Sequence, residues 1–157
     1  MNWQQIFKQQ LDALTAAAMP ADAACVTPAG KLECTLASVD AIGCAFTELT
    51  LRADRLSGAA VDELKQVSET LSSRINYLLE PISPIEIDQE GATVQMRSNP
   101  PQKDDDGTKY YELLVRREGL TLCRYSRAVG QSRHSVPANV TREVLMRLTG
   151  DFVDVAK

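Results

Sequence analysis

The chain contains 157 residues with a formal net charge of −4; 44% of its residues are hydrophobic and 24% are charged. This length and composition predict one globular domain spanning residues 1–157, which can bury a core without a disulfide or metal staple. They exclude a membrane-spanning helix, and the N-terminus lacks the basic and apolar regions of a signal peptide, so we expect a cytoplasmic protein.

The N-terminal segment predicts an amphipathic helix. Apolar side chains recur at helical spacing over residues 3–18, and Asn2 with Gln5 fits a capping box. Pro20 ends this pattern. Together with the further helix and strand breakers that follow, it predicts a loop over residues 20–30.

Two alternating segments then predict an antiparallel hairpin. Residues 32–36 alternate between apolar and polar side chains, and residues 44–53 form the return strand. In a regular register, Cys44 and Phe46 would fall on the polar face of that strand. We therefore expect a β-bulge there, because a bulge re-aims the side chains that follow it.

The longest periodic pattern predicts a central helix over residues 58–80. Ser57 is suited to the N-cap position, and Pro81 ends the helix because proline lacks the amide donor that the next turn needs. Six buried side chains, at roughly 1.5–3 kcal/mol each, contribute on the order of 10 kcal/mol before costs. We therefore expect this helix to be the central packing element. Its expected core residues are Val61, Leu64, Val67, Leu71, Ile75 and Leu78.

After Pro81 the period changes from helical spacing to short alternating runs. The pattern predicts one hairpin over residues 85–96 and a second over residues 111–122, each with a glycine in its turn. A polar loop over residues 99–108 is expected to join them. This change of period indicates a helix that feeds a hairpin-rich antiparallel sheet.

The last part of the chain predicts an irregular segment and a final helix. Residues 126–136 show no clear period, and Pro137 suits the first turn of a helix that extends to Phe152. The order of helix, two strands, helix, four strands and helix predicts a single α+β domain with an antiparallel sheet. This order loosely resembles helix-grip (TATA-binding-protein-like) domains and type III secretion chaperone-like domains. The resemblance implies a long central helix packed on the sheet.

Positive charge is concentrated in one stretch of the chain. Residues 109–147 carry eight basic and three acidic side chains, whereas residues 1–108 have a net charge of −8. Arginines and hydroxyls just before a helix N-terminus predict an anion or phosphate site. The alternative is that these arginines pair with carboxylates of the same chain or of a second copy. The residues of the predicted anion site are Arg124, Arg127, Arg133 and His134.

Apolar and aromatic side chains on both faces of the second hairpin predict a contact surface, made by Tyr110, Leu114, Arg116 and Tyr125. With the bipolar charge, they favour a protein-interaction module without enzymatic activity, with a homodimer as one form of the complex. The alternative function is a small-ligand site in a cavity between the long helix and the sheet. An isoelectric point near 5.0 argues against a nucleic-acid partner.

No motif in the sequence predicts catalysis, a metal or a cofactor. His134 lacks the serine, cysteine or aspartate motif of a nucleophilic triad. The four cysteines form no Cys-x-x-Cys pair, which favours free thiols over a zinc site. The acidic run Asp104–Asp106 lacks the ligand pattern of a calcium loop. We therefore expect neither enzyme activity nor a cofactor.

Overall fold

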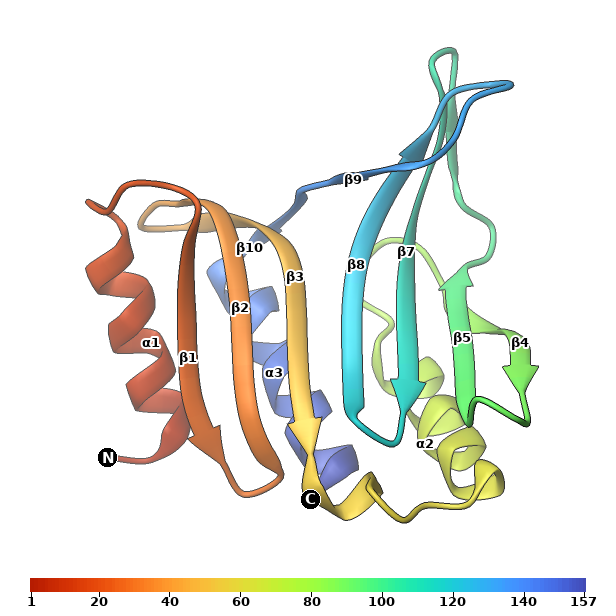
Figure 1. Cartoon of the computed structure of the whole chain (residues 1–157). Coiled ribbons are helices and arrows are strands. Elements are labelled where there is room, and N and C mark those ends of the chain that lie inside the picture. Colours follow the sequence, from red (N-terminus) through yellow and green to blue (C-terminus); the bar gives the residue numbers. More distant parts are fainter.

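The protein is built on one antiparallel sheet with three helices. The computed structural model describes residues 1–157 (Figure 1), which confirms the α+β class and the single domain. No helix is long and apolar enough to cross a membrane. The helices are α1 (Trp3–Leu14), α2 (Val61–Arg74) and α3 (Arg142–Ala156), with a short 3-10 turn η1 (Asp54–Leu56). The strands are β1 (Ala21–Thr27), β2 (Gly30–Val39), β3 (Gly43–Ala53), β4 (Ile82–Asp88), β5 (Thr93–Ser98), β6 (Gln102–Asp104), β7 (Gly107–Arg116), β8 (Gly119–Arg127), β9 (His134–Val136) and β10 (Ala138–Thr141).

The sheet consists of two halves that meet at one strand pair. Its order is β1-β2-β3-β8-β7-β5-β4, and every pair is antiparallel. β3 and β8 pair only where residues 49–52 lie against residues 119–122. Beyond this point the two strands separate, and β10 pairs with β3 while β9 pairs with β8 (Figure 1). Residues 134–141 therefore bridge the fork between the two halves.

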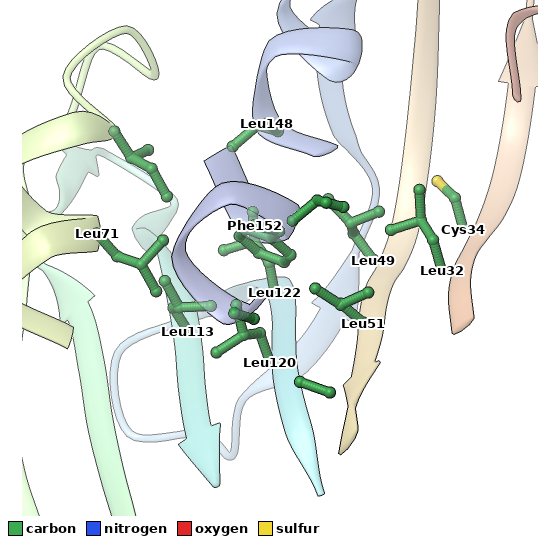
Figure 2. Close-up of a cluster of buried hydrophobic side chains, with 14 of the residues drawn as sticks. Leu32, Cys34, Leu49, Leu51, Leu71, Leu113, Leu120, Leu122, Leu148 and Phe152 are labelled. Carbon is green, nitrogen blue, oxygen red and sulfur yellow. The ribbon is translucent and has the colours of Figure 1, made fainter. Parts of the chain in front are cut away.

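The helices α2 and α3 cover one face of the sheet, behind the strands in the view of Figure 1. Leu71 of α2, Leu113 of β7 and Phe152 of α3 are fully buried and belong to one apolar cluster of 36 residues (Figure 2). A single cluster that includes all three helices explains why the chain forms one domain. We call the opposite side of the sheet the outer face.

The two edges of the sheet differ in how they are covered. The helix α1 lies beside β1, and the Gln10 amide donates to the carbonyl oxygen of Ala24 at 2.5 Å. The Gln10 carbonyl oxygen accepts the N–H of Ala24 at 2.6 Å. These two bonds satisfy backbone groups that an edge strand would otherwise present to another chain. At the other edge, β4 has a neighbour only on the side of β5.

The predicted loop over residues 20–30 is wrong, because residues 21–27 form β1. Pro20 and Pro28 lie just outside the strand, so these breakers mark its ends. The strand is poor in large apolar residues, and its buried positions include the small side chains of Ala23 and Cys25. Residues 21–27 form a strand because they pair with β2, and the local sequence pattern does not reveal that pairing.

The central helix is shorter than predicted. Its N-cap residue is Ala60, without a side-chain hydrogen bond, because Ser57 ends the preceding 3-10 turn. The helix ends before Ile75, whose backbone leaves the helical region, so Pro81 does not end it. Ile75 and Leu78 are nevertheless buried, since the irregular segment after α2 packs on the same core.

The final helix begins later than predicted. Its first residue is Arg142, and the hydroxyl of Thr141 caps it by accepting the N–H of Val144 at 3.0 Å. Pro137 lies between β9 and β10, and is therefore not in the first helical turn. The expected irregular segment 126–136 contains β9 and the end of β8.

Two local predictions are confirmed at the start of the chain. Asn2 and Gln5 form the predicted capping box, although the helix ends at Leu14. The pairing of β2 with β3 contains the expected bulge, because its register shifts between Thr35 and Ser38 of β2. The shift turns Phe46 onto the core face, where it is fully buried.

Candidate functional site

The predicted contact residues share one face of the sheet. Tyr110, Leu114 and Arg116 alternate along β7 with side chains that face α2. Tyr125 lies opposite Tyr110 on β8, so it projects to the same side. All four therefore lie on the outer face, where neither α2 nor α3 covers the sheet.

Two tyrosines and two arginines on this face form a stacked layer. The rings of Tyr110 and Tyr125 lie 5.9 Å apart between centroids, in a tilted arrangement. The guanidinium of Arg97 lies 4.4 Å from the Tyr110 centroid, and that of Arg133 lies 3.8 Å from the Tyr125 centroid. Both separations are within the range of cation–π attraction. We call these four residues the Tyr-Arg layer.

The carboxylate of Glu112 contacts both arginines of the Tyr-Arg layer. Its side chain is only 5% exposed and accepts hydrogen bonds from Arg133 Nη1 at 2.6 Å and from Gln95 Nε2 at 2.9 Å. Arg97 Nη2 lies 3.8 Å from the same carboxylate. A carboxylate this buried needs such partners, because an unpaired charge there would lose its hydration. Hydrogen bonding to Glu112, and then to Tyr110, raises the pKa of Arg133 above its ordinary value.

Arg124 lies on the helix-covered side of the sheet, away from this layer. It alternates with Tyr125 along β8, and its guanidinium lies 4.4 Å from the ring centroid of Tyr111. It makes two bonds to the carboxylate of Glu80, at 3.2 and 2.9 Å, and one to Gln102 at 2.9 Å. Most of its hydrogen-bonding capacity is therefore used within the chain.

The other two residues of the predicted anion site do not join Arg124. Arg127 is exposed at the end of β8 and donates to the carbonyl oxygen of Gln131 at 3.0 Å. His134 is exposed at the start of β9, where it pairs with Ser126. Since Arg133 is bound to Glu112, the four predicted residues occupy separate places and make no common pocket.

A cleft of about 740 Å³ lies where the segment after α2 meets the fork of the sheet. Tyr111 and Arg124 line it together with Lys109 and the segment that joins β9 to β10. This position differs from the predicted cavity between helix and sheet. Directly beneath α2, the side chains of Leu64, Leu71 and Val94 are fully buried in the apolar cluster.

The structure does not gather residues for metal binding or thiol chemistry. No group of three or more histidine, cysteine, aspartate or glutamate side chains lies close enough together to hold a metal ion. Burial raises the pKa of Cys44 and of Cys123 to about 11, which keeps both thiols protonated near neutral pH. The cysteines therefore have the character of packing residues.

The sequence patterns did not identify Arg97 and Glu112 as residues of the contact surface. Glu112 has the same strand parity as Tyr110, so alternation within β7 would place it on the outer face. No sequence pattern indicates that Arg97 of β5 and Arg133, from the turn after β8, approach the same carboxylate.

Comparisons with known protein families, with curated proteins and with solved structures found no match. The functional argument therefore rests on the geometry of the Tyr-Arg layer and its surroundings.

Proposed function

We propose that this chain is a non-enzymatic protein-interaction module whose contact surface is the outer face of β5, β7 and β8. The observation that carries the proposal is the Tyr-Arg layer, ordered by Glu112 on a side of the sheet that neither α2 nor α3 covers. A second copy of the chain is one partner that this surface can take.

The composition of the layer supports this role. Tyrosine and arginine are enriched among residues that contribute most to binding at protein interfaces. Their side chains are already stacked and hydrogen-bonded here, so binding would cost less side-chain entropy than it would for mobile side chains. Tyr110 is buried within the layer and supports Tyr125, whose partly exposed rigid ring offers apolar area and a hydroxyl at its edge.

Charge supports the same proposal and indicates how a partner would be oriented. Arg97 and Arg133 both approach a single carboxylate, that of Glu112, so the Tyr-Arg layer itself carries excess positive charge. The chain as a whole has a net charge of −4, so the rest of its surface is acidic on balance. An acidic surface, on another protein or on a second copy, would therefore be steered toward the Tyr-Arg layer.

The test combines light scattering after size exclusion with cross-linking at increasing protein concentration. We expect self-association, or association with a purified partner, that is lost in the Tyr125→Ala/Arg133→Ala variant. Lys65→Ala/Glu69→Ala, on the exposed side of α2, is the matched control and should associate normally. A monomer at all concentrations with no partner, or equal association by both variants, would contradict the proposal.

A further inference from the structure

We infer that β4 is the docking edge for an extended basic segment of a partner protein, which joins the sheet as one more strand. The inference rests on the proposed function, because it assumes that the chain acts by protein contact. It concerns the edge strand β4 and the acidic cleft beside it, whereas the proposed contact surface is centred on the Tyr-Arg layer.

The first observation is that the edge of β4 is open. Within the strand only Ile82 is buried, and every residue from Pro84 to Asp88 is exposed. The only side-chain hydrogen bond to its backbone comes from Ser72, whose hydroxyl donates to the carbonyl oxygen of Ile82 at 2.7 Å. At the opposite edge, by contrast, α1 lies beside β1 and Gln10 satisfies both backbone groups of Ala24. The backbone groups of β4 that point away from β5 are therefore free to pair with another strand.

The second observation is the apolar exposure of this strand. Ile85, at the register shift of β4, is 46% exposed, and Ile87, which pairs with Val94, is 36% exposed. Proline, bulges and charge usually protect an edge strand from pairing, and β4 carries Pro84, a register shift and two carboxylates, so only a segment of opposite charge suits this edge. Here Pro84 and a shift of register limit regular pairing to the last part of the strand. A docked segment would cover the two isoleucines.

The third observation is a small acidic cleft beside the same strand. It has a volume of about 210 Å³ and lies on the outer face. Neither Glu86 nor Asp88 forms a salt bridge, although Asp88 also accepts the N–H of Gly91 in the turn. A lysine or arginine side chain on a strand paired with the open edge of β4 can place its charge between these two carboxylates. The lining residues are Glu86, Asp88, Thr93, Gln95 and Leu114.

Charge complementarity selects a basic partner over a second copy of this strand. If two β4 strands paired antiparallel about Ile87, Glu86 of each copy would lie opposite Asp88 of the other. Like charges in opposed positions destabilise a strand pair. A segment with lysine or arginine at every second residue, apolar residues between them and no proline would instead match both faces of β4.

Fluorescence anisotropy with a short labelled peptide of alternating lysine and valine tests the inference. We expect saturable binding and, by hydrogen-exchange mass spectrometry, slower amide exchange in residues 85–88 when the peptide is bound. Glu86→Lys should weaken the binding about fivefold or more at low ionic strength, because it replaces an attraction by a repulsion. Asp105→Lys, an equal change of charge in the exposed β6–β7 turn, should bind as the wild type does.

A second peptide, N-methylated at alternate residues, has the same charge but cannot form the strand hydrogen bonds. Equal binding of this peptide, or binding without protection of β4, would show adsorption to acidic surface and overturn the inference. Self-association that Glu86→Lys strengthens would overturn it in favour of a second copy. If the peptide still binds to the Tyr125→Ala/Arg133→Ala variant, the docking edge is supported, even where the association test of the proposed function fails. A positive outer-face test with an unprotected β4 contradicts the docking edge alone.

Discussion

Replacing Glu80 by glutamine should destabilise the fold through Arg124. The two side chains are 13% and 10% exposed, and the carboxylate makes two bonds to the guanidinium. Glutamine keeps the shape of the side chain but removes its charge, so Arg124 stays in the sheet with an uncompensated positive charge. The amide of Gln102 would remain as its only other side-chain acceptor.

The expected cost follows from burial. Removing one partner of a buried ion pair costs about 3–5 kcal/mol, and partial exposure of this pair lowers our expectation to about 2–4 kcal/mol. For a domain of this size, that loss corresponds to a fall in melting temperature of about 5–12 °C. Arg124→Met should cost less, because Glu80 lines the cleft and its carboxylate can turn toward water there.

Denaturant titrations of the two single variants and of Glu80→Gln/Arg124→Met measure the pair directly. We expect the double variant to lose less free energy of unfolding than the two single variants lose in sum. The difference, which is the coupling energy, should exceed about 1 kcal/mol. Losses that add to within about 0.5 kcal/mol would refute the reasoning. They would mean that Glu80 does not hold Arg124, and the guanidinium would then be free for the anion site that the sequence predicted.

Two further predictions concern the core and the thiols. Leu71→Asp should abolish the cooperative thermal transition in circular dichroism, because it puts an unpaired charge at a fully buried position; Leu71→Met should still melt cooperatively, and a normal melting temperature for the aspartate variant would overturn the packing of α2. Burial raises the pKa of Cys44 and Cys123 from 9.0 to about 11, so unfolding releases protons above pH 9, and their contribution to stability should be lost as the pH rises from 9 toward 11. Denaturant titrations at pH 8 and pH 11 should show a smaller loss of stability in Cys44→Ala/Cys123→Ala than in the wild type, and equal losses would contradict this assignment.

Patterns within single elements predicted much of the fold. The core positions of α2 followed from helical spacing, since Leu64, Val67 and Leu71 are all buried. The second hairpin followed from alternation, and its turn glycine Gly119 adopts a positive φ of 140°. These features depend on neighbouring residues alone, so periodicity is enough to reveal them.

Elements stabilised by distant partners were predicted poorly. The strands β1, β9 and β10 are poor in large apolar residues or very short, and they are strands because β2, β8 and β3 lie beside them. The same reason explains Pro137, which suited a helix N-terminus locally but lies in the segment that bridges the fork of the sheet. Local propensity could not predict that fork, because the fork depends on where the pairing of β3 with β8 ends.

For the candidate site, the sequence by itself determined that Tyr110, Leu114 and Arg116 share one face, because alternation along a strand has a period of two. It also placed the excess positive charge after Lys109. Only the tertiary structure decided that Arg97 and Arg133 meet at Glu112, whereas Arg124 turns to the other side of the sheet and binds Glu80. Strand pairing brings together side chains that lie far apart in the chain. Because this pairing follows from the packing of the whole core, no local sequence pattern predicts it.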